Sequence, residues 1–159
     1  MKTAFFYATK YGCVVQCGKA IEEKLNGVMD FYNLKSNMQI DLTQYDKIII
    51  GGSIYVGRIQ KEVTQFALDN LNNLKDKKLG LFICCLSEGE EAETELRNAY
   101  PEVLLEQAAV KEYFGGQAIL NKMKFFDRFI IKKVAKTEKD IYKLSKEKIE
   151  KFVKDLNNI

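Results

Sequence analysis

Residues 3–14 constrain the fold more than any other stretch, because they have the pattern of a buried strand, a tight turn and a helix start. Residues 3–8 form an apolar run of strand length, and residues 9–14 form a small polar turn. A helical pattern then continues through Val14, Ile21 and Leu25. A helix start exposes unpaired N–H groups and the positive end of the helix dipole. This order predicts an α/β domain with an anion-binding turn.

Apolar strands and helical patterns alternate along the rest of the chain. Further strands are predicted at 28–32, 47–52, 79–86 and 112–117, and helices at 13–25, 60–71, 92–99 and from 137 onward. The uninterrupted isoleucines at 48–50 favour a central strand covered on both faces. A short helical turn is expected at 40–46, and a loose capping box at 137–140 is expected to open the last helix. The alternation predicts a three-layer, doubly wound α/β sandwich with a five-stranded parallel sheet.

Composition indicates a single soluble domain spanning residues 1–159. The chain is 47% apolar and 30% charged and contains one proline, which argues against a domain boundary. No apolar stretch reaches the roughly 18 residues of a membrane span. We also find no signal peptide pattern, so we expect a cytoplasmic protein.

The chain has four cysteines and no histidine, which narrows its chemistry. The absence of histidine excludes Ser-His-Asp and Cys-His catalysis. Neither Cys13 and Cys17 nor Cys84 and Cys85 have the spacing of a zinc site, so no metal site is predicted. Adjacent residues of a strand point to opposite faces, so Cys84 and Cys85 are not expected to act together. Buried, reduced thiols are expected, with Cys13 distinguished by its place at a helix start.

Three loops should meet at one edge of the predicted sheet. Loops 9–14, 53–58 and 87–91 each follow a strand, and the carboxyl ends of parallel strands share an edge. In such sheets, ligands bind beyond those ends, where the strand order reverses. The three loops therefore predict one binding site.

The first of these loops resembles the phosphate loop of flavodoxins. Thr9-Lys10-Tyr11-Gly12-Cys13-Val14 follows the first strand, and Thr9 and Gly12 match the flavodoxin pattern T-x-T-G-x-T. The resemblance implies the strand order 2-1-3-4-5, numbered along the five strands, and the cofactor FMN, both of which are features of flavodoxins.

Two longer stretches resemble a narrower branch of flavodoxin-like proteins. Residues 50–58, Ile-Gly-Gly-Ser-Ile-Tyr-Val-Gly-Arg, and residues 125–132, Phe-Phe-Asp-Arg-Phe-Ile-Ile-Lys, are similar to segments of menaquinone-dependent protoporphyrinogen dehydrogenases. That likeness implies a flavodoxin fold with FMN. It also makes the oxidation of protoporphyrinogen, with a quinone as electron acceptor, a candidate activity.

The resemblance places FMN contacts in all three loops. The implied contact residues are Thr9, Lys10, Tyr11, Gly12, Cys13, Val14, Ser53, Ile54, Tyr55, Gly57, Ser87, Glu88 and Gly89. Tyr55 could stack on the flavin ring, and the acidic loop 87–91 would lower the flavin's potential by like-charge repulsion. The alternatives without a cofactor contact are that Gly12 only forms a turn, that Tyr55 faces solvent, and that the acidic residues complement the first turn of a helix. No side chain in these loops is an evident acid–base catalyst, so redox chemistry would belong to the cofactor.

Val14 stands where the flavodoxin pattern has a threonine. A hydrogen bond to a charged acceptor contributes roughly 1.5–3 kcal/mol. We therefore expect weaker FMN binding than a full set of hydroxyls would give, and Val14→Thr is expected to strengthen it.

Residues 119–136 form a basic amphipathic segment. Its apolar and basic members are Phe125, Phe126, Phe129, Ile130 and Val134, with Lys122, Lys124, Arg128, Lys132, Lys133 and Lys136. The segment could lie on the inner face of an anionic membrane, which would suit a quinone partner. Alternatively, its aromatic side chains pack on the sheet. No recognised nucleic-acid motif accompanies the charge, so nucleic-acid binding is not expected.

Three functions follow from these observations. The first is an FMN-binding flavodoxin-like protein that transfers electrons to a redox partner protein or a quinone. The second is an enzyme that oxidises protoporphyrinogen IX with a quinone as acceptor. The third is a flavodoxin fold without FMN that serves as an interaction module.

Overall fold

The computed structural model describes residues 1–159 and contains a central parallel sheet. Its parallel strands are β1 (Lys2–Tyr7), β2 (Val28–Asn33), β3 (Lys47–Tyr55), β5 (Lys78–Cys84) and β6 (Val110–Tyr113). They lie in the order β2-β1-β3-β5-β6, and each neighbouring pair is parallel. Counted along these five strands, this is the predicted order 2-1-3-4-5. The short β4 (Arg58–Ile59) folds back antiparallel on the end of β3.

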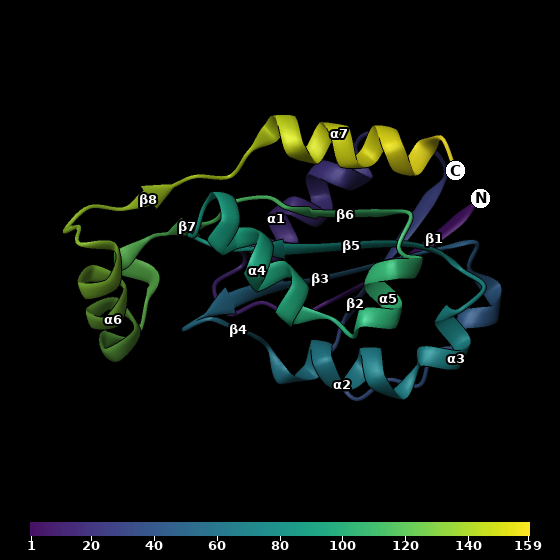
Figure 1. Cartoon of the computed structure of the whole chain (residues 1–159), viewed down its shortest axis with the longest axis horizontal. Coiled ribbons are helices and arrows are strands. Elements are labelled where there is room, and N and C mark those ends of the chain that lie inside the picture. The colour runs from purple at the N-terminus through teal and green to yellow at the C-terminus, as the bar shows by residue number, and fades with distance from the viewer.

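Helices cover both faces of the sheet and complete the three layers (Figure 1). One face carries α1 (Cys13–Glu22) and α7 (Lys146–Asn157). The other carries α2 (Lys61–Asp69), α3 (Leu71–Leu74), α4 (Gly89–Ala99) and α5 (Glu102–Gln107). Side chains alternate along β3, so Ile49 joins one core cluster while Ile48 and Ile50 join the other. The sheet is thus buried on both sides, as the isoleucine run predicts.

The C-terminal third differs from the predicted elements. The fifth parallel strand ends at Tyr113, because Gly115 turns the chain with a φ of 76°. The next strand, β7 (Gln117–Ala118), pairs antiparallel with β8 (Ile141–Tyr142) outside the main sheet. The last helix begins at Lys146 and not at 137–140, because Ser145 provides its N-cap and accepts a hydrogen bond from the Lys148 N–H.

The helix predicted at 60–71 is divided in two, because Asn70 leaves helical geometry between α2 and α3. The helical turn predicted at 40–46 is a short 3-10 helix, Leu42–Gln44. A second 3-10 helix, Leu120–Lys122, follows β7.

The helix α6 (Phe125–Ala135) lies beyond the carboxyl ends of the strands, between β7 and β8 (Figure 1). The side chains of Phe125, Phe126 and Phe129 are 69%, 77% and 60% exposed. The alternative in which these aromatic side chains pack on the sheet is therefore wrong. None of the helices has the length and apolar character needed to cross a bilayer.

Close packing of α1 on the sheet depends on Gly18. A Cβ atom at this position would lie 2.3 Å from Cε1 of Phe5 and 2.9 Å from Cε1 of Phe31. Phe5 is fully buried in the core cluster between α1, α7 and the sheet. Gly18 thus allows α1 to approach β1, and this approach fixes where the helix begins.

We predict that Gly18→Ala destabilises the protein. Alanine improves helix propensity by about 1 kcal/mol, but overpacking a filled core costs about 1–3 kcal/mol. The clash involves a buried ring, so we expect a net loss of unfolding free energy in urea titrations followed by circular dichroism. Gln16→Ala, at an exposed position of the same helix, serves as the control. A higher urea midpoint for Gly18→Ala would contradict the packing argument.

Candidate functional site

The carboxyl ends of β1, β3 and β5 form the floor of a small cavity. Parallel pairing sets Tyr7 beside Gly51 and Ser53 beside Cys84, so the three strands end at the same edge. The cavity measures about 60 Å³. Its lining residues are Thr9, Lys10, Tyr11, Cys13, Ser53, Ile54, Tyr55, Cys84, Cys85, Leu86, Gly116, Gln117, Ala118, Met123 and Ile131.

The start of α1 is arranged to receive an anion. Gly12 is the N-cap residue with a φ of 88°, a left-handed conformation that favours glycine. The Thr9 hydroxyl accepts a hydrogen bond from the Gly12 N–H at 3.0 Å and shapes the turn. No side chain caps the helix, which leaves the N–H groups of its first turn for a ligand. Lys35 donates to the Thr9 carbonyl at 2.7 Å and adds a positive charge beside the turn.

A buried carboxylate, Asp127 of α6, joins the loop after β1 to the end of β3. Its oxygens accept hydrogen bonds from the hydroxyl of Tyr11 and, at 2.5 Å, from the hydroxyl of Tyr55. The Lys10 ammonium lies 2.9 Å from the same carboxylate and 3.8 Å from the centre of the Tyr55 ring. Asp127 is only 8% exposed, so these donors replace the water that its charge would otherwise bind. We refer to Lys10, Tyr11, Tyr55 and Asp127 as the Asp127 cluster.

The contacts of the Asp127 cluster shift the pKa values of its members. Burial alone would raise the pKa of Asp127, but hydrogen bonds from Tyr11, Tyr55 and Lys10 outweigh it and lower the pKa to about 2. Burial and the hydrogen bond to Asp127 raise the pKa of Tyr55 to about 12. The carboxylate is therefore ionised and both phenols are neutral at pH 7.

The side chains of the Asp127 cluster also narrow the cavity. Pockets for small organic ligands usually measure about 300–1,000 Å³, whereas 60 Å³ holds a few water molecules. The lysine over the Tyr55 ring covers the face that a flat ligand would stack on. A ligand larger than a few atoms can enter only when these side chains move.

The cavity brings together more than half of the residues predicted for the site. Thr9, Lys10, Tyr11, Cys13, Ser53, Ile54 and Tyr55 line it. Gly12, Val14, Gly57, Ser87, Glu88 and Gly89 do not. Gly89 already begins α4, and Ser87 and Glu88 line a neighbouring hollow beside Lys143. The third loop therefore does not line the cavity, whereas residues 116–118 do.

Val14 is fully buried in the core cluster between α1, α7 and the sheet. Its side chain therefore packs against apolar neighbours, and only its backbone N–H is available to an anion. A threonine hydroxyl at this position would be buried, so the argument that Val14→Thr strengthens FMN binding loses its basis. Contact between FMN and the backbone of residue 14 stays a prediction.

The sequence reasoning missed Asp127 as a site residue. Within residues 119–136 it is the only acidic side chain, and this isolation among lysines was the available signal. Other missed lining residues are Cys84, Cys85, Leu86, Gly116, Gln117, Ala118, Met123 and Ile131. The last five come from the C-terminal third, whose path outside the sheet has no marked sequence pattern.

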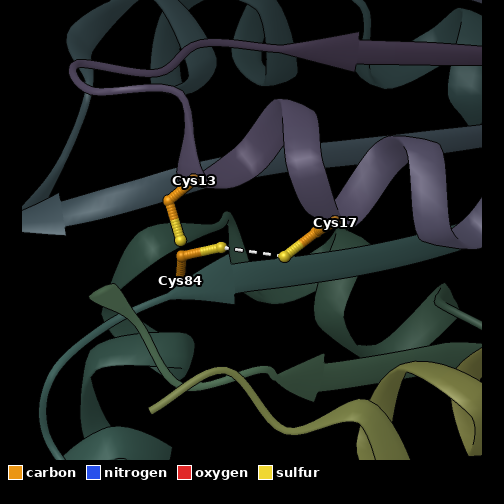
Figure 2. Close-up of side chains that lie close together, drawn as sticks. All are labelled: Cys13, Cys17 and Cys84. Atoms are coloured by element: carbon orange, nitrogen blue, oxygen red, sulfur yellow. Dashed lines mark hydrogen bonds between the residues drawn. The ribbon is translucent and has the colours of Figure 1, made fainter. Parts of the chain in front are cut away.

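The structure also gathers three of the four cysteines, although their sequence spacing gave no sign of it. Cys13 and Cys17 lie one turn apart on α1 and face Cys84 at the end of β5 (Figure 2). Cys85 joins the core cluster on the opposite face of the sheet, as predicted for adjacent residues. Hydrogen bonds from Cys17 and Cys84 lower the pKa of the Cys13 thiol, while the contact with Cys13 raises the pKa of the other two.

The fold and the site together define a doubly wound α/β protein whose first helix begins, without a side-chain cap, at the carboxyl ends of the strands. A family model described as a flavodoxin domain matches residues 4–144. The chain belongs to this flavodoxin domain family. A search of curated proteins finds no match.

Solved structures of flavodoxins and a flavodiiron protein share the fold. Flavodoxin 1 from Bacillus cereus is 17% identical with a TM-score of 0.60, and the match covers 99% of this chain and 98% of that one. A Streptococcus pneumoniae flavodoxin is 16% identical with a TM-score of 0.61, covering 99% of each chain. The Flv1 flavodiiron core from Synechocystis sp. PCC6803 is 13% identical with a TM-score of 0.63. That match covers 99% of this chain but only 34% of the flavodiiron chain.

We predict that Asp127→Asn lowers stability in a pH-dependent way. The folded pKa of about 2 lies below the ordinary value of about 3.9, so the carboxylate stabilises the fold above that value. The difference in unfolding free energy between wild type and variant should be about 2 kcal/mol at pH 7. It should decrease as the pH falls from about 5 toward 2.

Denaturant unfolding at several pH values measures this difference. Asp76→Asn, at an exposed position, is the control and should change stability by less than about 0.5 kcal/mol. A pH-independent difference for Asp127→Asn would show that its charge is not what stabilises the site.

Proposed function

We propose that this protein binds FMN at the carboxyl edge of its sheet and transfers electrons to and from redox partners. The observation that carries the proposal is the uncapped start of α1 beside the Asp127 cluster, in a chain of the flavodoxin domain family. A phosphate fits the α1 turn, because N–H groups and the helix dipole favour an anion there. A flat ring fits beside Tyr55 and the strand ends once the Asp127 cluster opens.

The residues of this chain would bind, orient and tune the cofactor, which supplies the redox chemistry when bound. The N–H groups of the α1 turn would hold the phosphate, with Lys10 and Lys35 adding positive charge. The Tyr11 and Tyr55 rings would form walls beside the flat ring. Glu88, Glu90 and Glu91 bring negative charge near this edge, which disfavours reduction of a cofactor that becomes more negative. Lys143 lies 3.2 Å from Glu88 and offsets part of that charge.

A second candidate is an oxidoreductase that oxidises protoporphyrinogen IX with a quinone as acceptor. It rests on the resemblance of residues 50–58 and 125–132, and on the position of α6. A quinone is a membrane lipid, so its reduction needs an enzyme that reaches the membrane surface. Consumption of protoporphyrinogen coupled to quinone reduction separates this enzyme from a carrier of electrons.

A third candidate is an interaction module without FMN. The observation in its favour is the small cavity, which Lys10, Tyr11 and Tyr55 of the Asp127 cluster narrow. Flavin binding by the purified protein excludes this candidate.

We predict that the protein binds FMN more tightly than riboflavin. The two ligands differ by the phosphate, and each charge-assisted hydrogen bond contributes roughly 1.5–3 kcal/mol. Two or more such bonds at the α1 turn should give FMN an advantage of at least about 100-fold. Quenching of flavin fluorescence on titration with protein measures both affinities.

Lys10→Gln tests the placement of the phosphate. This variant should reduce the ratio of the FMN affinity to the riboflavin affinity. Any opening of the cavity that the variant causes should change both affinities by the same factor. Lys19→Gln, at an exposed position of α1 farther from the turn, should leave the ratio unchanged. Equal affinities of wild type for the two flavins would contradict a phosphate site at α1.

We also propose that α6 contacts an anionic membrane surface. Phe125, Phe126, Phe129 and Val134 are exposed on this helix, and Lys124, Lys133 and Lys136 lie exposed beside them. Exposed aromatic side chains together with lysines are typical of helices that lie in the membrane interface. Such a contact would place the cavity edge near a quinone and would make the protein peripheral at the inner face of the membrane.

We predict that the protein binds vesicles containing anionic lipid better than neutral vesicles. Phe126→Ala should weaken binding roughly tenfold or more, since a buried aromatic side chain contributes about 1.5–3 kcal/mol. Lys133→Gln should weaken it about fivefold, since each lysine near an anionic surface contributes about 1 kcal/mol. Co-sedimentation with vesicles measures both effects.

Leu68→Ala is the matched control, because Leu68 is exposed on α2, on another side of the molecule. It should leave vesicle binding unchanged. Equal binding to neutral and anionic vesicles, or an equal loss with Leu68→Ala, would refute the assignment to α6.

A further inference from the structure

We propose that Cys13, Cys17 and Cys84 form a three-sulfur site for a trivalent, thiophilic metalloid ion such as As(III). The three Sγ atoms lie within 4.8 Å of one another, and those of Cys17 and Cys84 are 3.5 Å apart. Figure 2 shows the three side chains pointing toward one another from α1 and the end of β5. All three cysteines are free thiols.

The sulfur positions match a common centre. Three thiolates at about 2.3 Å from one ion lie about 3.4–4.0 Å apart, for geometries from pyramidal to trigonal planar. The Cys17–Cys84 separation already falls in this range, and the largest separation needs to shrink by about 0.8 Å at most for a planar centre and about 1.4 Å at most for a pyramidal one. Rotation of the Cys13 side chain at the helix start supplies a movement of that size.

Charge and burial select a trivalent ion. Cys13, Cys17 and Cys84 are 7%, 1% and 2% exposed and pack in an apolar cluster, so a net charge there is costly. Three thiolates carry three negative charges, which a trivalent centre cancels. Cu(I) would leave two negative charges, and Zn(II) would leave one and also prefers a fourth ligand.

The binding reaction balances without an oxidant or reductant. Arsenous acid carries three hydroxyl groups on As(III), and three thiols replace them one by one. Three As–O bonds break, three As–S bonds form, and the thiol protons leave with the hydroxyls as three water molecules. Neither sulfur nor arsenic changes its oxidation state.

The ion has a path to the sulfurs. Cys13 and Cys84 line the cavity at the strand ends, and Cys17 lies one helical turn deeper. The cavity has room for a few water molecules, which is enough for neutral arsenous acid. The site therefore does not depend on flavin binding or on opening of the Asp127 cluster.

Native mass spectrometry of the reduced full-length protein with sodium arsenite, without added flavin, tests the site. The expected product is a single adduct whose mass increase equals one arsenic atom less three hydrogens. Binding through only two thiols would retain a hydroxyl on arsenic and give a heavier adduct. The wild-type mass therefore reports the number of sulfurs even where a cysteine variant fails to fold.

Variants identify which sulfurs bind. Cys13→Ala, Cys17→Ala and Cys84→Ala should each abolish the three-sulfur adduct and weaken arsenite binding at least about 100-fold, beyond the 10–100-fold typical of residues that only support a ligand. Cys85→Ala removes an equally buried thiol from the other face of the sheet and should preserve the adduct.

Three results with arsenite alone would overturn the proposal. They are an absent adduct at equimolar arsenite, an adduct that keeps its hydroxyl, and loss of the adduct in Cys85→Ala. Competition with Cu(I) and Zn(II) tests the charge argument. As(III) should be retained at equal concentrations, and its displacement by either metal would refute a site selected by neutrality.

Discussion

The parallel pairing of β1, β3 and β5 is the constraint on which the rest of the molecule depends. It aligns three carboxyl ends at one edge, so loops that are far apart in sequence surround one cavity. The pairing persists because both faces of the sheet are buried, with Ile49 packed on one side and Ile48 and Ile50 on the other. The same packing holds α1 against β1 through Gly18 and directs the uncapped start of the helix toward that edge.

Asp127 couples the C-terminal segment to this edge. A carboxylate that is 8% exposed must be compensated. Lys10 and Tyr11 provide its partners from the loop after β1, and Tyr55 provides one from the end of β3. The donors are therefore part of the cavity wall, and the acceptor belongs to a helix outside the three layers. Positioning α6 and narrowing the cavity are thus two consequences of one set of contacts.

The sequence predicted the parts of the fold that repeat a simple pattern. Apolar runs located the five parallel strands to within a few residues, and 3-4 spacing located most of the covering helices. It failed after residue 114, where Gly115 turns the chain away from the sheet and Ser145 replaces the expected cap at 137–140. Contacts such as Asp127 with Tyr11 join residues 116 positions apart, and local spacing carries no information about them. The same reason concealed the meeting of Cys84 with Cys13 and Cys17.

The small volume of the cavity bears on how tightly a flavin can bind. If the open state is a minor population, the observed dissociation constant equals the intrinsic one divided by the open fraction. Opening breaks contacts between Asp127 and three donors, each of a kind that contributes roughly 1.5–3 kcal/mol when one partner is charged. Phosphate contacts at the α1 turn are of the same kind and magnitude, and they oppose that cost. The free energy of flavin binding therefore depends on the difference between two sets of charge-assisted hydrogen bonds. One set is made within the protein and the other is made with the ligand. A change at Asp127 should accordingly alter the affinities for FMN and riboflavin by the same factor, whereas the loss of a phosphate contact at the α1 turn alters the ratio of the two affinities.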